Sequence, residues 1–440
     1  MFLSTLGLNE GQMRAMLQEK RPKKGTSVKK QSRCATRSHI RAKQFVERLL
    51  EKLPKMPSHF ARAQSDKLYL QEDFTSIRDV YSFVSRRAKA KGIKMMVWSA
   101  FLEIFHQKKL SVHPLKKDCC DDCEMYRLGY MSEEDFFKHR QQVTEARLEK
   151  ENDKKAASAN VLHLIADVQK ILLLPLIKNN NQYYKTKLQM RNYTIYNLHN
   201  KKVRCKIWVE TEAGCSANVF ASMLSSFIEE CLQENPKITE IIIWTDNCCH
   251  QNKNVLLSNV LLYLAMKYNI VITQKYFVIG HSQNEADSAH SCIERCVKKR
   301  RIYTPKMYVE AITQARKFGP DRDCNEGYEV DLLDYTVFKD FCGVKYYSQI
   351  RPGHGAGDPT VGDIIALRYT PNGKMYFKME GFTSPWSEMP HQLPNPTCFI
   401  KERLYESRIP IKASKYKDLQ FLKKFIPKKH HHFYDTLPYQ

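Results

Sequence analysis

Carboxylates at three places in the middle of the chain could bind divalent metal ions. Asp167 and Asp246 each follow an apolar run, VLHLIA and ITEIIIWT, and further carboxylates lie in the segment HSQNEADSAHSCIE at 281–294. If the two runs are neighbouring strands, their carboxyl ends meet in one crevice, where open α/β sheets place ligands. Close carboxylates repel each other unless a cation lies between them. Mg²⁺ or Mn²⁺ would suit these oxygen ligands and support phosphodiester chemistry.

Helical geometry separates the acidic residues of the segment 281–294. Ser282, followed three residues later by Glu285, matches a capping box, which assigns Glu285 to the start of a helix. Asp287, His290 and Glu294 fall on one face of that helix and can point together at a sheet.

We therefore expect Asp287 to be the third carboxylate beside Asp167 and Asp246. Glu294 is the alternative third carboxylate, although it could instead pair with the nearby Lys298. In a simpler interpretation there is no metal site, Asp246 only caps the following helix and Asp167 is a solvated strand end.

Cysteines and histidines before residue 140 predict a second metal site. Cys120 and Cys123 form a C-x₂-C pair, the spacing at which two thiolates reach one Zn²⁺. His113 and His139 would complete a Cys₂His₂ set for structural zinc, and a pair of free thiols is the alternative. Weaker candidate ligands are Cys34, Cys119, His39 and His106.

The charge of the chain predicts a polyanionic partner. The 440 residues carry a formal net charge of +24, and their 42% hydrophobic content excludes wholesale disorder. We expect DNA as the partner and the nucleus as the location, although the basic N-terminal stretch could instead be a solubilising tail. The basic residues expected to bind nucleic acid are Lys23, Lys24, Lys29, Lys30, Lys298, Lys299, Arg300 and Arg301.

Two further features narrow the class of protein. No apolar run approaches the roughly 20 residues that span a bilayer, so we expect no membrane partner. The start of the chain has no secretory pattern, which favours reduced thiols or metal ligands over disulfides. A homo-oligomer is left open.

The elements that must position these residues follow a regular order after residue 160. Three strands come first, and then helix, strand, helix, strand and helix alternate, which predicts an α/β fold with one mixed sheet. Four regions are expected. They are a disordered basic arm at 1–43, a helical region at 44–158 with the zinc pair and a long exposed helix from Glu133, the sheet domain at 159–330, and a small β module with a basic helical tail at 331–440.

Two motifs resemble a known family. They are DNCCHQNKN at 246–254 and GHSQNEADSAHSCIE at 280–294, and they are similar to the ribonuclease H-like domain of uncharacterised animal proteins regarded as derived from DDE/D-type transposases. The similarity extends over most of residues 40–440. It implies a ribonuclease H-like mixed sheet flanked by helices, with Asp167, Asp246 and Asp287 as the acidic triad.

The resemblance implies a transposase-derived DNA-binding protein with a two-metal site for phosphodiester cleavage or strand transfer. One departure is His250, where the family commonly has glycine, and its ring could crowd the site. The alternative is therefore a catalytically inactive, host-adopted nucleic-acid-binding or scaffold protein. A ribonuclease or exonuclease would use the same carboxylates. We expect Asn247, Gln251 and Asn254 to orient backbone or phosphate, and His281 either to support the site or to close its loop.

Overall fold

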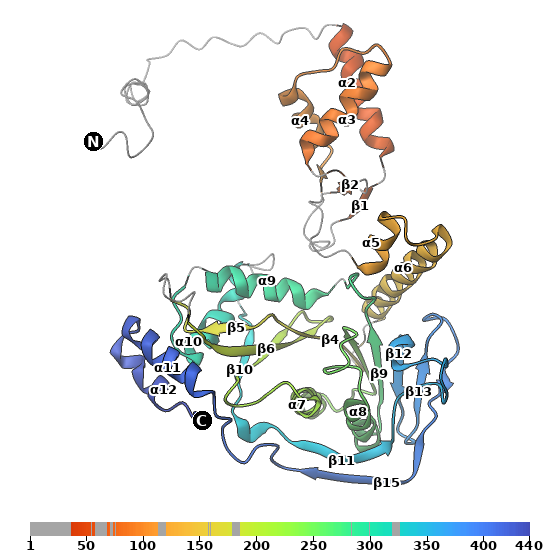
Figure 1. Ribbon diagram of the computed structural model, residues 1–440. Coiled ribbons are helices and arrows are strands. Elements are labelled where there is room, and N and C mark those ends of the chain that lie inside the picture. Colours follow the sequence, from red (N-terminus) through yellow and green to blue (C-terminus); the bar gives the residue numbers. More distant parts are fainter. Residues whose placement is uncertain are drawn as a thin grey trace, which may run out of the picture. The chain divides into compact units, whose positions relative to one another are not determined.

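A computed structural model gives the fold (Figure 1). It describes residues 37–53, 55–57, 68–70, 74, 76–112, 120–156, 158, 160–177, 185–282, 284–298, 300–318 and 326–440. The chain forms two compact units. The first comprises 1–56 and 67–115, and the second comprises 57–66 and 116–440. Most of the expected basic arm lies outside the described residues.

The first unit is mainly helical, as expected. Its elements are α2 (Arg37–Lys52), β1 (Lys55–Pro57), β2 (Leu68–Leu70), α3 (Ile77–Ala90), α4 (Trp98–Gln107) and β3 (Leu110–Ser111). Apolar residues at helical spacing on the three helices form one core, with Leu50, Val84 and Phe101 fully buried. The three short strands form a small sheet that the sequence did not predict.

The second unit is built on a mixed ten-stranded sheet. The strands of its centre are β4 (Val161–Val168), β6 (Leu188–Asn197), β7 (Val203–Val209), β8 (Glu240–Thr245) and β9 (Val271–Tyr276), and β5 (Leu172–Leu174) pairs with β6. Strand β4 is parallel to β8 and antiparallel to β6, and β8 is parallel to β9. The expected α/β architecture with one mixed sheet is confirmed.

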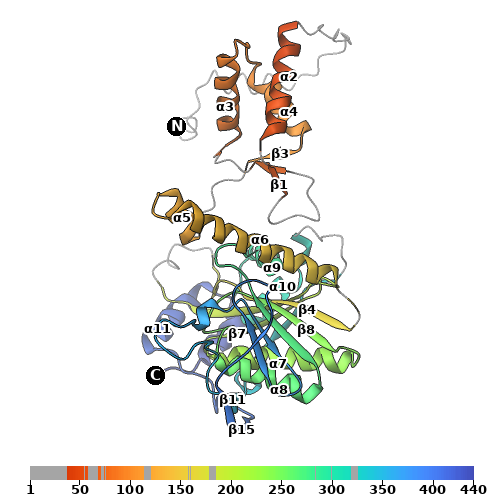
Figure 2. The same ribbon diagram turned by 90° about the vertical axis from the view of Figure 1, so that its right-hand side faces the viewer.

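Helices cover both faces of this sheet (Figures 1 and 2). On one face, α7 (Ala217–Glu234) and α8 (Val255–Tyr268) pack against β4 and β8. On the other face, α9 (Glu285–Lys298) and α10 (Pro305–Thr313) pack against β5, β6 and β7. Burial on both sides explains the almost unbroken apolar runs of the central strands.

The C-terminal segment does not form the separate β module that the sequence predicted. The hairpin of β12 (Ala366–Tyr369) and β13 (Met375–Lys378) exists, with Gly373 at a positive φ in its turn, but β12 pairs with β9 and extends the main sheet. Strands β14 (Ser387–Glu388) and β10 (Glu329–Leu332) also join it. The added strands satisfy backbone groups that an open edge would leave unpaired.

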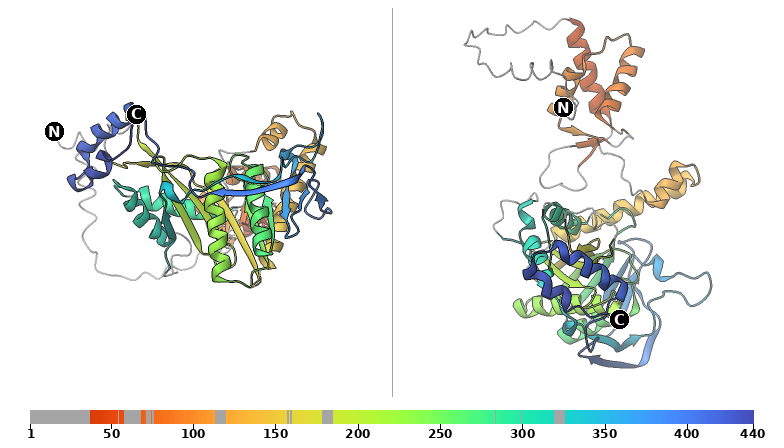
Figure 3. Two further views of the ribbon diagram at one scale, coloured as in Figure 1. Left: turned by 90° about the horizontal axis from the view of Figure 1, so that it is seen from below. Right: turned by 60° about the vertical axis from the view of Figure 1, so that its left-hand side comes forward.

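The remaining C-terminal elements pack on the same unit. Strands β11 (Asp340–Tyr347) and β15 (Gln392–Lys401) form a two-stranded sheet. Helices α11 (Ala413–Leu422) and α12 (His431–Asp435) contribute apolar residues to the core beneath α9 and α10 (Figure 3).

The long charged helix is not exposed on all sides, contrary to expectation. Helix α5 (Asp121–Arg127) and α6 (Glu133–Lys155) belong to the unit that contains the sheet. Ser132 caps α6 by accepting a hydrogen bond from the Asp135 amide at 3.1 Å, as predicted. One stripe of α6 is buried, and its members are His139, Val143, Ala146, Lys150 and Asp153. Their alternating spacing of four and three residues places them on a single face.

No helix in the described ranges is long and apolar enough to cross a membrane.

Candidate functional site

The parallel pairing of β4 and β8 brings two of the predicted carboxylates to the same edge of the sheet. Ala166 pairs with Thr245 at the end of the register, so Asp167 and Asp246 follow at equivalent positions. Both side chains are only partly accessible. The carboxyl ends of these two strands therefore lie side by side at one edge of the sheet, where open α/β sheets usually bind ligands.

Asp167 lies in a buried, acidic environment. Its Oδ1 accepts a hydrogen bond from the Val168 amide at 2.8 Å, and its Oδ2 accepts one from Asn284 Nδ2 at 2.6 Å. Burial, followed by repulsion from Asp287 and Asp246, raises the pKa of Asp167 to about 7. The negative charges of Asp287 and Asp246 thus disfavour the ionised form of Asp167.

Helix α9 brings Asp287 and His290 to Asp167. One ligand atom of each of these three residues lies within 4.8 Å of the other two. His290 Nε2 lies 3.0 Å from Thr194 Oγ1, and burial lowers the pKa of His290 to about 4. The ring is therefore neutral at physiological pH.

Asp246 is held by the loop that follows it and does not cap α8. Its Oδ1 accepts hydrogen bonds from Asn252 Nδ2 at 2.6 Å and from the Cys248 amide at 3.1 Å. The cap of α8 is Asn254, whose side chain accepts from the Leu257 amide at 2.9 Å. Asn252 was not predicted from the sequence, although its place six residues after an expected metal ligand was a usable signal.

The other acidic residues of α9 are engaged elsewhere. Glu294, the alternative third carboxylate, forms a 2.7 Å ion pair with Lys170 instead of pairing with Lys298. The predicted capping role of Glu285 is wrong, because its carboxylate pairs with Lys150 of α6. Asn284 takes the capping position, with its Oδ1 2.9 Å from the Ala286 amide.

We call the sheet edge with Asp167, Asp246 and the nearby Asp287 the acidic edge. Several buried polar atoms near it lack a hydrogen-bond partner among the described residues. They are Tyr193 Oη, Asn192 Oδ1, Thr245 Oγ1 and Asn252 Oδ1. Burial and the charges of Asp246 and Asp167 raise the pKa of Tyr193, so its hydroxyl stays protonated beside them. Unpaired buried groups are costly, and their concentration at a set of carboxylates fits a site that binds a cation with its water.

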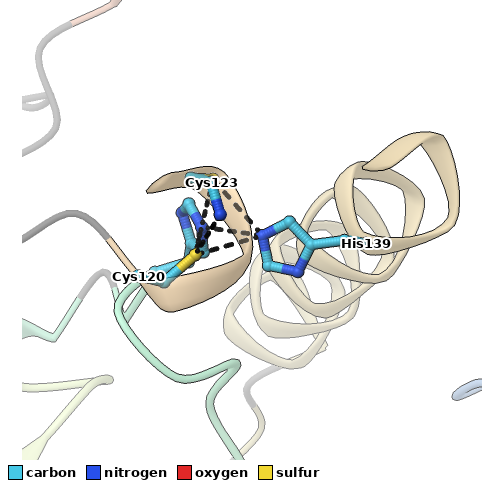
Figure 4. A group of neighbouring side chains, drawn as sticks. Cys120, Cys123 and His139 are labelled. Atoms are coloured by element: carbon cyan, nitrogen blue, oxygen red, sulfur yellow. Dashed lines mark hydrogen bonds between the residues drawn. The ribbon is translucent and has the colours of Figure 1, made fainter. Parts of the chain in front are cut away.

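Four side chains form a Cys/His cluster in the same unit (Figure 4). Cys120 and Cys123 come from the start of α5, His139 from α6, and His281 from the loop after β9. The Nε2 atom of His281 lies 3.2 Å from Cys120 Sγ, 3.4 Å from Cys123 Sγ and 3.1 Å from His139 Nε2. His139 Nε2 lies 3.4 and 3.5 Å from the two sulfurs.

These separations are close to the edges of a tetrahedral metal site, and the 3.1 and 3.2 Å distances are slightly shorter than such edges. With metal–sulfur bonds of about 2.3 Å and metal–nitrogen bonds of about 2.0 Å, tetrahedral ligands lie roughly 3.3–3.8 Å apart. Asp122 Oδ2 lies 3.3 Å from His139 Nδ1 and orients the ring so that Nε2 faces the sulfurs. The cluster can therefore hold a metal ion.

Gly280 allows the second histidine to reach the cysteines. Its φ is +70°, and a Cβ there would lie 2.6 Å from Cys120 Cβ. Any residue with a side chain at position 280 would push the loop away from the Cys120–Cys123 pair. The role of His281 could not be chosen from its own position in the sequence, but the adjacent Gly280 was a signal for a close approach of the backbone. His113, the predicted ligand, lies outside the described residues.

The expected nucleic-acid-binding residues are only partly described. Lys23, Lys24, Lys29, Lys30 and Lys299 lie outside the described residues. Near the end of α9, Lys298 and Arg301 are exposed, and Arg300 donates to Gln314 at 2.7 Å.

The loop residues around Asp246 mostly contact backbone. Asn247 donates to the Phe277 carbonyl and accepts from Lys253 Nζ at 2.9 Å. His250, the departure from the family pattern, is exposed on this loop and does not fill the crevice.

Comparison with known proteins gives one match. Residues 178–320, about a third of the chain, match the model of a family described as a domain of unknown function (DUF8701). This stretch contains Asp246, Asp287 and two histidines of the sites above, at 281 and 290, whereas Asp167 and the cysteine pair precede it. No curated protein and no solved structure matches the sequence.

Proposed function

We propose that the protein is a transposase-derived, ribonuclease H-like DNA-binding protein whose acidic edge cleaves or transfers phosphodiester strands with divalent metal ions. The observation that carries the proposal is geometric: parallel strands β4 and β8 end side by side at Asp167 and Asp246, and α9 brings Asp287 to Asp167. The raised pKa of Asp167, caused by burial and then by repulsion from Asp287 and Asp246, agrees with this arrangement. A fold that confines three carboxylates pays a free-energy cost unless a cation joins them.

The sheet supports the proposed fold. Strands run in the spatial order β7, β6, β4, β8 and β9, with the first three connected antiparallel and the last two added in parallel. The family resemblance implies such a mixed sheet, with Asp167, Asp246 and Asp287 as its acidic triad. Asp167 lies at the end of β4, Asp246 follows β8, and Asp287 lies on α9.

Each residue of the site has a distinct task in this proposal. Asp167, Asp246 and Asp287 would hold the ions, which supply an activated water or hydroxyl and stabilise the leaving oxygen when bound. Asn252 and Asn284 fix the two strand-end carboxylates through hydrogen bonds of 2.6 Å. The exposed Lys298 and Arg301, near the end of α9, would contribute to binding the DNA backbone.

The metal of the Cys/His cluster is, in our proposal, structural zinc. Two thiolates and two imidazoles in a tetrahedral arrangement are typical of closed zinc sites. The cluster joins α5, α6 and the loop that leads into α9, so the ion would fix the helix that carries Asp287.

A cleavage assay tests the catalytic part of the proposal. The full-length protein with zinc bound should nick duplex or single-stranded DNA in the presence of Mg²⁺ or Mn²⁺. The Asp246→Asn variant should bind DNA but should not nick it. The control is Glu294→Gln, which removes a carboxylate of α9 that pairs with Lys170 and should retain activity. DNA binding without cleavage under any divalent ion would favour the inactive, host-adopted protein, and cleavage of RNA alone would favour a ribonuclease.

A further inference from the structure

We infer that His290 is a direct ligand of the metal ion at the acidic edge, which makes the site a mixed oxygen and nitrogen site that prefers Mn²⁺ to Mg²⁺. The inference rests on the proposed function, because it names the ion that this edge takes. His290 lies outside the acidic triad, yet one of its nitrogens is within 4.8 Å of ligand atoms of both Asp167 and Asp287.

The sheet and α9 fix the orientation of the His290 ring. Thr194 of β6 pairs with Asp167 of β4, and cross-strand partners point to the same face of a sheet. His290 Nε2 lies 3.0 Å from Thr194 Oγ1. The Thr194 contact occupies Nε2 and leaves Nδ1 facing the carboxylate, 4.0 Å from Asp167 Oδ2.

Nδ1 has no hydrogen-bond partner among the described residues. A separation of 4.0 Å from Asp167 is too long for a hydrogen bond, and His290 is only 7% exposed. The side chain as a whole is buried, so few water molecules can reach the space between this nitrogen and the carboxylate. A divalent ion at this place would be within reach of Nδ1 and of one oxygen each from Asp167 and Asp287.

The donor set determines which ion fits. Asp287 and His290 lie three positions apart, so one face of α9 presents both ligands together. Mg²⁺ prefers an all-oxygen shell, whereas imidazole suits first-row transition ions. Among these ions, Mn²⁺ also accepts carboxylates readily.

Pulsed electron paramagnetic resonance on the full-length protein tests the inference directly. Zinc is kept bound so that the Cys/His cluster is blocked, and Mn²⁺ is added as the probe. We expect bound Mn²⁺ to show the nitrogen coupling of a directly bound imidazole, and Asp167→Asn to abolish the signal. His290→Gln should remove the coupling and weaken Mn²⁺ binding by about tenfold or more, with a smaller effect on Mg²⁺.

Two further variants distinguish a ligand from a packing residue. Glutamine can keep a polar atom near Thr194 but has none at the position of Nδ1, whereas His290→Asn places an amide oxygen there. We therefore expect His290→Asn to retain more Mn²⁺ affinity than His290→Gln and to lose the preference over Mg²⁺. The exposed His250 provides the control, since His250→Gln should change neither affinity nor coupling.

The Mn²⁺ experiments distinguish an error in the role of His290 from an error in the proposed acidic metal site. Mn²⁺ that binds in an Asp167-dependent way but shows no nitrogen coupling would overturn the role of His290 and leave the acidic site intact. Mn²⁺ binding that is indifferent to both Asp167→Asn and Asp246→Asn would overturn both. If His290→Gln does not fold, the coupling in the unmodified protein and its loss in Asp167→Asn decide the question.

Discussion

Asp167 occupies a position that lowers the stability of the folded protein at neutral pH. Its carboxylate is mostly buried, and this burial, followed by repulsion from Asp287 and Asp246, raises its pKa to about 7 in the folded protein, compared with an ordinary value near 3.8. The folded state therefore binds a proton more tightly than the unfolded state. It follows that the stability of the protein without bound Mg²⁺ or Mn²⁺ falls as the pH rises from about 4 to about 7.

Replacing this carboxylate should stabilise the protein without Mg²⁺ or Mn²⁺. We expect Asp167→Asn to raise the free energy of unfolding at pH 8 by roughly 1–4 kcal/mol and to have little effect near pH 4. Denaturant unfolding over a pH series, with zinc retained, measures the difference. Glu402→Gln on the surface is the matched control, and an equal effect of both variants at all pH values would contradict the argument.

At the scale of the element, α6 depends on polar contacts more than on apolar burial. Lys150 Nζ pairs with Glu285 at the start of α9, and burial is the main cause that lowers the pKa of Lys150. Lys275 of β9 lies 2.7 Å from Asp153, which also accepts from Trp244 Nε1 at 2.8 Å. These contacts attach the helix to the sheet and to the segment that carries Asp287.

Breaking the Lys150–Glu285 pair should loosen this attachment. Among the described residues, Lys150→Met leaves Glu285 with the more distant Lys154 at 3.9 Å as its ion-pair partner. Because Lys150 is buried and Glu285 is partly exposed, we expect a loss of about 2–4 kcal/mol in the free energy of unfolding. Lys154→Met, at the more exposed position, should cost less than about 1 kcal/mol. In the double variant Lys150→Met with Glu285→Gln, part of the stability should return, which a double-mutant cycle would measure.

Besides the ion pairs of α6, the Cys/His cluster also holds α5, α6 and the loop before α9 together. We expect about one equivalent of zinc in the purified protein, and we expect Cys123→Ser or His281→Ala to lose it. Loss of the ion should expose α5 and α6 to hydrogen exchange while the central strands stay protected, and DNA cleavage should fall because Asp287 is no longer held. Cys249→Ser, at an exposed cysteine, is the control. A variant that lacks zinc but exchanges like the unmodified protein would exclude a structural role.

At the scale of the whole molecule, the net charge of +24 predicts binding to DNA. Each neutralised phosphate releases a condensed counterion. With six to ten such contacts, the affinity for DNA should therefore fall by a factor of roughly 10³–10⁵ when the salt concentration rises from 50 to 200 mM. Removing residues 1–36, which ends before α2 begins, should lower the slope of affinity against salt. Asp246→Asn should bind as well as or better than the unmodified protein. Affinity that hardly responds to salt would mean that the charge serves another purpose.

The α/β order of the sheet domain, and the two aspartates at the ends of its strands, could be predicted from the sequence. Alternating strand and helix patterns with apolar cores are local signals, and an aspartate directly after a buried strand marks the edge of a sheet. The same reasoning placed Asp287 on the correct helix face and identified Cys120 and Cys123 from their spacing alone.

The residues that come from distant parts of the chain to the two candidate metal sites could not be predicted from the sequence. His281 joins cysteines about 160 positions away because the loop after β9 passes close to α5 at Gly280. His290 becomes a candidate ligand because Thr194, on another strand, orients its ring. The buried face of α6 was missed because that face contains His139, Lys150 and Asp153, so helical periodicity of apolar residues could not reveal it. Pairing between segments far apart in the chain leaves no periodic trace in the sequence.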